Sequence, residues 1–416
     1  MTSAHTAHTA HTANEPLITD DWHVSGKIYR DPAIFARELS AVYGRTWVFV
    51  AHESEIPSGG DYRTAHIGRQ PVIVNRGSDD GAVNVMFNRC RHRGAAVCRR
   101  ESGNANFFRC AYHGWTYGSS GELTGVPFDD GYGDSFDRPA MGLVHVPRVE
   151  TYRGFVFASL DPGIEPLPEY LGNARRYLDF IADIGTDGPE LASGAHKLVF
   201  KGNWKLQVEN TIDPYHFSFT HKSWLDILKE RSGKSSPWLK NVRTNPEWRG
   251  IDLGGGHAVH EYGSLDAGGP DNAHAIAIGE LIPFNLNIFP SLAFVGAHLR
   301  LIVPRAVDET WVYLYPLLPK GADEAERSRI LRDHEIFYGP SGFGSTDDVE
   351  VAFDRVTDGS QASESSADWA LMSRGLDREE VDEATGVRIG RSSDEVPQRA
   401  YLRRWLELLE AGHEQD

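Results

Sequence analysis

Between about residue 47 and residue 160, apolar residues come in short runs interrupted by turn residues, a pattern typical of β-strands. Three of these runs are Pro71–Val74, Val83–Phe87 and Gly154–Ala158. Because the runs are short and closely spaced, we expect a small antiparallel β domain. Ahead of it, Asp31–Tyr43 carries apolar residues at helical spacing and begins with an Asp-Pro pair, a typical helix start.

After this region the chain mixes strands and helices in separate groups. A Pro-rich linker precedes the first predicted helix, and the expected order is linker 161–169, helix 170–184, strands 287–294, 299–304 and 310–317, and helices 323–338 and 396–411. Because strands and helices cluster separately, the predicted fold class is α+β, with a small antiparallel β domain placed before a domain of helices and antiparallel sheet.

Residues 231–280 are rich in Gly, Pro, Ser and Asn and include the triplet Gly254-Gly255-Gly256. A stretch of this length and composition favours a lid or entrance loop, or partial disorder.

The first thirteen residues repeat His, Thr and Ala without an apolar core. This is not the pattern of a secretory signal, and residues 1–20 are predicted to be a disordered tail. His5, His8 and His11 are not expected to form a functional metal site.

The 416-residue chain carries a formal net charge of −17. This charge argues against nucleic acid and against anionic membrane surfaces as partners. The most apolar run, residues 292–303, contains His298 and Arg300, so no membrane span is expected. The chain contains only three cysteines. Few cysteines and no signal predict a cytoplasmic protein.

Two short motifs mix cysteine and histidine: Cys90 with His92, and Cys110 with His113, in the pattern C-x-H-x17-C-x2-H. A Rieske [2Fe–2S] cluster needs two thiolates on one iron and two imidazoles on the other. A structural zinc site uses the same residue types, but it pairs Cys with Cys and His with His. The spacing therefore favours a Rieske cluster.

A second candidate metal site lies at His216 and His221, which are five residues apart. On a bent or irregular helix, this spacing brings two imidazoles near one point. Two His and one carboxylate form the facial triad of non-haem Fe(II) oxygenases, which leaves the opposite face open for O2 and substrate. His298, in a predicted strand, is a candidate to face the active site. His257 and His260 are interpreted as surface or pocket residues.

The two motifs together resemble the α-subunits of Rieske aromatic-ring-hydroxylating dioxygenases, and the resemblance covers nearly the whole chain past the tail. It implies that Asp348 is the third iron ligand, with Asp347 as the alternative ligand or a helix N-cap. It also implies that Asp213 links His216 or His221 to His113 of a neighbouring subunit, within a ring of three. The family commonly has three residues between its Asn and Asp, whereas two separate Asn210 and Asp213 here, so a catalytic role for Asn210 stays open.

The same resemblance implies a domain organisation: an N-terminal helix at 21–44 on the catalytic domain, a Rieske domain at 45–160 and a catalytic domain at 161–416. Respiratory-chain Rieske proteins have a disulfide at the positions of Ala95 and Tyr112, and a serine at that of Trp115. With fewer hydrogen-bond donors to the cluster, we expect a low reduction potential and electrons from NAD(P)H. Cys98 is expected to be an ordinary thiol.

The resemblance implies a terminal oxygenase that inserts both atoms of O2 into a small aromatic substrate and gives a cis-dihydrodiol. NADH would supply electrons through a flavin-containing reductase, directly or through a ferredoxin, to an α3 or α3β3 assembly. The resemblance is to enzymes for benzoate-type or other simple aromatic acids, and a carboxylate substrate would need an Arg or Lys in the pocket. A Rieske monooxygenase for hydroxylation or demethylation, an electron carrier without oxygenase activity and a structural zinc protein remain the alternatives.

Overall fold

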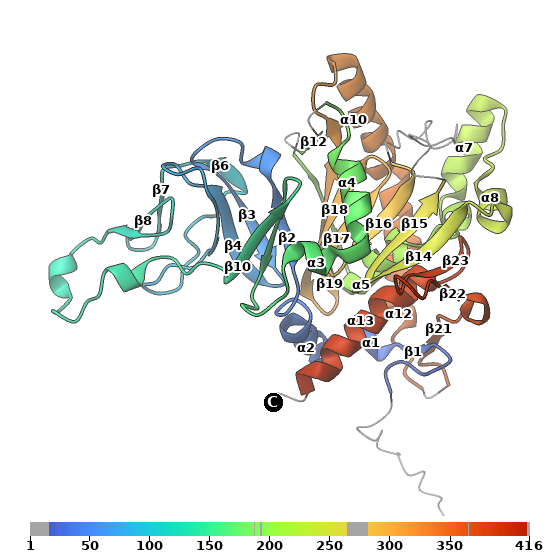
Figure 1. Cartoon of the computed structure of the whole chain (residues 1–416), viewed down its shortest axis with the longest axis horizontal. Helices are drawn as coiled ribbons and strands as arrows, with labels where there is room; N and C mark the ends of the chain where they lie inside the picture. Colours follow the sequence, from blue (N-terminus) through green and yellow to red (C-terminus); the bar gives the residue numbers. More distant parts are fainter. Residues whose placement is uncertain (1–15, 187, 192–193, 264–281, 365, 414–416) are drawn as a thin grey trace, which may run out of the picture.

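The short apolar runs before residue 160 fold into small antiparallel sheets that build one lobe of the molecule. In the computed structural model, the described residues are 16–186, 188–191, 194–263, 282–364 and 366–413. The predicted tail up to residue 15, with His5, His8 and His11, lies outside them. Figure 1 shows the smaller lobe in blue to teal beside a larger lobe in green to red.

The smaller lobe consists of sheets with the strand orders β5-β4-β3-β6, β7-β8-β9 and β10-β11-β2. All pairings are antiparallel, as the short runs and tight turns predicted. The strands are β2 (Val48–His52), β3 (Asp61–Ile67), β4 (Gln70–Arg76), β5 (Val83–Phe87), β6 (Ser102–Asn104), β7 (Phe107–Arg109), β8 (Thr116–Gly118), β9 (Leu123–Gly125), β10 (Arg148–Tyr152) and β11 (Phe155–Ser159).

A long antiparallel sheet with the order β13-β19-β18-β17-β16-β15-β14-β23-β22 forms the centre of the larger lobe. Its strands are β13 (His196–Phe200), β14 (Trp248–Gly254), β15 (His257–Tyr262), β16 (Phe284–Ile288), β17 (Leu292–Val295), β18 (His298–Ala306), β19 (Glu309–Pro316), β22 (Glu380–Val381) and β23 (Arg388–Arg391). Two short pairs lie beside it, β1 (His23–Ser25) with β21 (Trp369–Leu371) and β12 (Pro189–Glu190) with β20 (Leu318–Pro319).

Helices pack on both faces of this sheet, which is why its central strands are buried on both sides. One apolar cluster joins α3 and α4 to the sheet, and another joins α2, α5 and α13 to it. The helices are α1 (Lys27–Arg30), α2 (Pro32–Ala41), α3 (Leu167–Leu171), α4 (Arg175–Ala182), α5 (Trp204–Thr211), α6 (Phe217–Thr220), α7 (Lys222–Ser232), α8 (Trp238–Thr244), α10 (Glu324–Tyr338), α11 (Phe343–Asp347), the π-helix η6 (Asp348–Asp354), α12 (Arg355–Gly359) and α13 (Val396–His413). The predicted α+β class is confirmed.

The alternation of β18 decides which of its residues face the candidate site. Leu299, Leu301 and Val303 belong to the cluster on the α3–α4 face, whereas Ile302 belongs to the cluster that contains α5. Successive side chains of a strand point to opposite faces. The even-numbered residues of β18, among them His298 and Arg300, therefore point toward α5.

Three predictions about secondary structure are wrong. The single strand predicted at 287–294 is instead the end of β16 and the start of β17, with a turn between them. Residues 231–262 are not a loop, because they contain the end of α7, helix α8 and the hairpin of β14 and β15. The glycine triplet is the turn of that hairpin, and its φ angles of 87°, 62° and 83° require glycine. The predicted helix at 170–184 is broken at Gly172, which has a φ of 47°. Residues 264–280 of the predicted loop lie outside the described residues.

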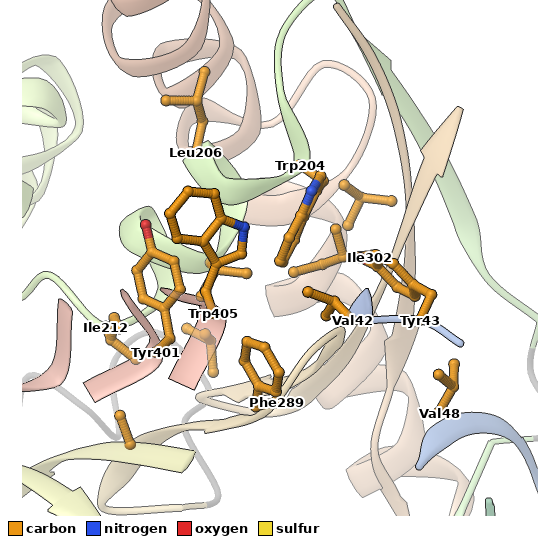
Figure 2. Packing of buried hydrophobic residues seen from close by; sticks show 14 of the residues in the cluster. Val42, Tyr43, Val48, Trp204, Leu206, Ile212, Phe289, Ile302, Tyr401 and Trp405 are labelled. Atoms are coloured by element: carbon orange, nitrogen blue, oxygen red, sulfur yellow. The ribbon is translucent and has the colours of Figure 1, made fainter. Parts of the chain in front are cut away.

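The two ends of the described chain meet at the start of α5. Helix α2 packs on α13, and Glu38 of α2 lies fully buried between them. Its carboxylate accepts hydrogen bonds from the indoles of Trp204 and Trp405, each at 2.8 Å, and pairs with the fully buried Lys205. Figure 2 shows the two indoles among apolar residues of the same cluster. Burial lowers the pKa of Lys205, and the charge of Glu38 opposes this shift.

No helix in the described part of the chain is long and apolar enough to cross a membrane. The cytoplasmic location stays a prediction.

Replacing Glu38 by Ala should destabilise the protein by about 3–5 kcal/mol, because it leaves a buried ammonium and two indole N–H groups unpaired. Chemical denaturation of the purified protein measures this loss. The matched control is Asp226→Ala, which removes the partner of the exposed Lys222 and should cost less than about 1 kcal/mol. Equal losses in the two variants would contradict a special role for the buried pair.

Candidate functional site

The two Cys/His loops of the smaller lobe have the same backbone turn. The N–H of Gly94 donates to the carbonyl of Cys90, and the N–H of Gly114 donates to the carbonyl of Cys110, each at 3.0 Å. Both glycines have positive φ angles, 76° and 74°. Left-handed backbone favours glycine, so the same residue type closes both turns and lets the loops approach a common centre.

The four candidate cluster ligands differ in exposure in pairs. Cys90 and Cys110 are buried and have free thiols, whereas His92 and His113 lie partly exposed at the tip with ring centroids 4.5 Å apart. The Nδ1 atom of His92 is buried and has no hydrogen-bond partner among the described residues. Two interior thiols and two partly exposed imidazoles fit the donor set that would hold a Rieske cluster.

Tyr117 adds a hydrogen bond that the sequence analysis missed. Its hydroxyl oxygen accepts the backbone N–H of Arg91 at 3.0 Å and lies 3.2 Å from Sγ of Cys90. Burial and the neighbouring Cys90 raise the pKa of Tyr117, so the phenol stays protonated and can donate to the sulfur. The low reduction potential expected for the cluster stays a prediction. The hydroxyl of Tyr117 is one hydrogen-bond donor that would raise this potential. Cys98 is a partly buried thiol outside the loops.

The second candidate site lies where α5, α6 and η6 meet. His216 and His221 flank the single turn of α6, and their Nε2 atoms lie 3.6 Å and 3.2 Å from Oδ1 of Asp348. One ligand atom from each of the three residues lies within 4.8 Å of the others. The five-residue spacing works because α6 is only one turn long, so both rings reach the same point. This donor set fits a 2-His-1-carboxylate metal site.

Asp347 lies on the other side of His221. Its Oδ2 is 3.3 Å from Nδ1 of His221, whereas Asp348 faces Nε2 of the same ring. Adjacent helical residues diverge by about 100°, which separates the two carboxylates. Asp347 makes no helix-capping hydrogen bond, so the N-cap interpretation is wrong. A carboxylate on the distal nitrogen fixes the tautomer and orientation of the ring.

Asn210 contacts two of the three converging side chains, and Asp213 lies beside one of them. Nδ2 of Asn210 donates to Oδ1 of Asp348 at 2.9 Å and lies 3.4 Å from Nε2 of His216. Oδ2 of Asp213 lies 3.8 Å from Nδ1 of His216, too far for a hydrogen bond, and its Oδ1 accepts the backbone N–H of His216 at 3.3 Å. Asp213 is predicted to link either His216 or His221 to a neighbouring subunit. In the structure it lies beside His216.

The charges at this site favour a cation. Burial by itself lowers the pKa of His216, but the carboxylates of Asp213 and Asp348 outweigh it and raise the pKa to about 10. Burial opposes ionisation of Asp348, yet His216 and His221 hold its pKa below the usual range. A bound divalent cation would take the place of that extra positive charge.

The cavity beside the triad is lined by polar and charged side chains, the triad included, and by apolar and aromatic ones, among them Phe217, Trp238, Val295 and Phe337. Arg300 also lines the cavity. In the sequence, this residue is visible only as an interruption of an apolar run. His298, in contrast to its prediction, does not line the cavity and contacts Arg300 instead.

His257 and His260 were interpreted as surface or pocket residues, and this is wrong. Both are buried, with exposures of 1% and 0%. Each bonds to protein oxygen atoms, of Tyr170 and of Ser392 respectively, and burial lowers the pKa of both rings. They are structural parts of β15.

Comparison with known families and proteins identifies both halves of the chain. The family model of the Rieske [2Fe-2S] domain matches residues 46–150, and that of the ring hydroxylating alpha subunit (catalytic domain) matches residues 189–401. The chain belongs to the ring-hydroxylating oxygenase α-subunits. The exact domain boundaries stay a prediction.

Curated relatives of this family member are large subunits of dioxygenases. The chain is 36% identical to the toluate 1,2-dioxygenase subunit alpha of Pseudomonas putida, over 78% of this chain and 76% of the relative. It is 32% identical to the 2-halobenzoate 1,2-dioxygenase large subunit of Burkholderia cepacia, over 87% of this chain and 82% of the relative. It is 35% identical to the large oxygenase component of a Ralstonia sp. naphthalene 1,2-dioxygenase system (77% and 77%).

Solved structures agree with this family assignment. A naphthalene 1,2-dioxygenase variant bound to phenanthrene has a TM-score of 0.83 at 30% identity, covering 96% of this chain and 95% of that one. The naphthalene 1,2-dioxygenase of a Rhodococcus sp. bound to indole has a TM-score of 0.80 at 30% identity (94% and 95%). A quaternary ammonium Rieske monooxygenase shares the fold, with a TM-score of 0.66 at 18% identity.

These findings confirm the main functional prediction. The protein is an aromatic-ring-hydroxylating dioxygenase α-subunit with a Rieske [2Fe–2S] domain and a catalytic domain of the kind that binds mononuclear iron. The catalytic domain contradicts the electron-carrier and zinc-protein alternatives. The monooxygenase alternative is not favoured, because the curated relatives described above are dioxygenases.

Asp348→Ala should remove most of the mononuclear iron and nearly all turnover, because it deletes one of three convergent ligands. Asp347→Ala is the matched variant and should keep most of the iron, with an affinity weakened about tenfold. Iron analysis and the visible spectrum of the cluster measure both effects. Greater iron loss in Asp347→Ala would transfer the ligand role to Asp347.

Tyr117→Phe should lower the reduction potential of the cluster, because a hydrogen bond to a cluster sulfur stabilises the more negative reduced state. A bond of about 1–2 kcal/mol corresponds to roughly 40–90 mV for one electron. Redox titration monitored by EPR measures the shift. Tyr132→Phe, at the same end of the lobe, is the control and should leave the potential unchanged. An unchanged potential in Tyr117→Phe would mean that its hydroxyl does not bond to the sulfur.

Proposed function

We propose that Cys90, His92, Cys110 and His113 ligate the Rieske cluster, and that His216, His221 and Asp348 hold the Fe(II). The first group belongs to the proposed Rieske domain 45–160 and the second to the proposed catalytic domain 161–416, onto which segment 21–44 packs. When bound, the cluster supplies single electrons and the iron activates O2. The arene, O2, two protons and two electrons from NADH give the cis-dihydrodiol. The convergence of the triad beside a cavity with aromatic side chains in its wall carries this proposal.

We propose that electrons reach the iron from the cluster of a neighbouring copy. Figure 1 places β7 and β8, next to the cluster loops, at one end of the molecule and α7 and α8 at the other. The tip that holds the loops exposes large apolar residues: Tyr112 is 57% exposed and Phe128 is 90% exposed. An exposed apolar tip favours contact with another surface. A ring of three copies in which each tip meets the next catalytic domain satisfies both observations.

Asp213 is suited to the receiving end of this path. Its side chain is 24% exposed and lies outside the triad, beside the Nδ1 edge of His216. If the 3.8 Å gap to Nδ1 of His216 closes, a carboxylate there accepts a hydrogen bond from this ring and, on its exposed side, one from His113 of the neighbouring copy. Asp347 occupies the equivalent edge of His221, which leaves His216 as the histidine on the path.

The proposed partners follow from this assembly. A flavin-containing reductase, directly or through a ferredoxin, delivers electrons from NADH. A smaller β-subunit completes an α3β3 assembly, or the α-subunits form an α3 ring alone. The exposed Arg91 and Arg93 at the cluster loops suit an acidic surface on the donor or on the next copy.

The experiment that tests the function is substrate-dependent O2 uptake by the purified, iron-loaded protein with a surrogate reductase and a panel of aromatics. Isotopically labelled O2 should enter the product twice. Incorporation of one labelled atom would instead identify a monooxygenase.

Asp213→Asn should keep both metals and a reducible cluster but lose most product, because the amide offers N–H groups where an acceptor is needed. Stopped-flow reoxidation of the reduced cluster, with substrate and O2 present, should slow by at least about tenfold. The control, Asp226→Asn on the exposed face of α7, should reoxidise at the wild-type rate. Normal reoxidation in Asp213→Asn would remove this residue from the electron path.

A further inference from the structure

The guanidinium of Arg300 is a buried cation beside the triad. It is 5% exposed, and it lines the same cavity as His216, His221 and Asp348. The pleat of β18 points it there, and the ring of Tyr338 lies 5.6 Å from its central carbon. Its position is therefore fixed by the central sheet and by α10.

The atoms that bond to Arg300 are all neutral. Its Nε donates to Nε2 of His298 at 2.9 Å, and its Nη1 donates to Oδ1 of Asn210 at 3.1 Å and to Oγ1 of Thr211 at 3.3 Å. His298 accepts this bond with an unprotonated nitrogen, and burial, together with the charge of Arg300, holds its pKa well below the usual range. Among the described residues, none forms an ion pair with Arg300 and none accepts a hydrogen bond from its Nη2.

The other buried arginines of the described chain are different. Arg63 pairs with Glu55, and Arg399 pairs with Glu379 at 2.8 Å. A buried cation is costly unless an anion compensates it. The negative charge of Asp348 stabilises the Arg300 cation, but Asn210 lies between the two side chains and they are not in contact. A metal ion bound to Asp348 would offset part of this negative charge. Nη2 of Arg300 is thus the guanidinium nitrogen left to bind an anion, because Nε and Nη1 already donate to neutral groups.

We propose that Arg300 binds the carboxylate of the substrate, so that the enzyme acts on aromatic acids of the benzoate type. This inference rests on the proposed function of the same site. A guanidinium and a carboxylate match in charge, and Nη2 can donate its N–H groups to the carboxylate. The aromatic side chains Phe217, Trp238 and Phe337 in the cavity wall suit the aromatic ring.

The position of Arg300 also restricts which ring carbons react. Arg300 contacts Asn210, and Asn210 contacts Oδ1 of Asp348, so the guanidinium lies beside the triad and not at a distant end of the cavity. A benzoate held there presents the carboxyl-bearing carbon and its neighbour to the triad. Arg300 is thus a specificity-determining residue.

Isothermal titration of the purified, metal-loaded protein with benzoate and with benzamide tests this inference. Benzamide has nearly the same shape as benzoate but no charge. The wild-type protein should bind benzoate at least about tenfold more tightly than benzamide. This comparison needs no variant, and equal or tighter binding of benzamide would overturn the inference.

Substitutions then assign the preference to Arg300. Arg300→Gln should weaken benzoate binding about 100-fold and leave benzamide within about threefold, while Arg300→Lys should recover part of the benzoate affinity. Arg305→Gln, at the end of β18 and outside the cavity lining, is the matched control and should bind benzoate normally. Iron content and the cluster spectrum should be unchanged in all three variants. Unaltered benzoate binding in Arg300→Gln would overturn the assignment.

The failure of this inference is distinguishable from failure of the proposed function. If the enzyme oxidises neutral aromatics independently of Arg300 and does not bind benzoate, the dioxygenase function stands and the inference is overturned. If benzoate binds through Arg300 but no aromatic is oxidised, the inference is supported and the proposed function fails.

Discussion

The geometry of the candidate iron site depends on how α5 is held in the core. Glu38 ties the start of α5 to α2 and α13 through Trp204, Lys205 and Trp405. At the other end of α5, Glu209 accepts hydrogen bonds from Tyr29 and Tyr401, which again belong to the N-terminal and C-terminal segments. Burial raises the pKa of Glu209 to about 7, although both tyrosines oppose the shift. The buried carboxylates of Glu38 and Glu209 therefore hold the two ends of α5 in place, although burying each of them is energetically unfavourable.

This arrangement links the ends of the described chain to the chemistry in its middle. Asn210 directly follows Glu209, and its amide is the link between Asp348 on one side and Arg300 on the other. A small rotation of α5 would break both contacts at once. Conserving the volume of the core is thus not sufficient for this site, because the direction of the helix also has to be kept. Directional hydrogen bonds to buried charges supply that constraint.

The sequence predicted those parts of the site that are close together in the chain. Cys90 with His92, Cys110 with His113 and His216 with His221 are short-range pairs, and their spacing reflects the geometry of a loop or a single helical turn. Asp348 came only from resemblance, since nothing local to it indicates which residues it meets. Helices with clear caps were predicted well: Asp31 caps its helix as expected, and Asp323 caps the helix predicted at 323–338.

What the sequence could not predict depends on tertiary contacts. Arg300 interrupts an apolar strand, and only the order of strands in the sheet shows that its face is the one covered by α5. Tyr117 contacts Cys90, which lies 27 residues earlier in the chain. The β14–β15 hairpin was hidden because Gly- and Asn-rich composition is typical of loops, whereas burial of Trp248 and Tyr262 stabilises the strands there. Both the missed roles of Arg300 and Tyr117 and the missed hairpin arose because tertiary packing outweighed the local sequence pattern.

The π-helix that begins at Asp348 has a consequence for how the protein can change. A π-helix corresponds to an α-helix that has accepted an extra residue, and the insertion is retained although it weakens the hydrogen-bond ladder. Deleting one residue from Asp348–Asp354 would restore regular α-helix, but it would also turn everything before it by about 100° relative to α12. The carboxylate of Asp348 would then swing away from both imidazoles. The length of this segment is therefore under a stricter constraint than its composition, and a single-codon deletion there would be more damaging than most substitutions.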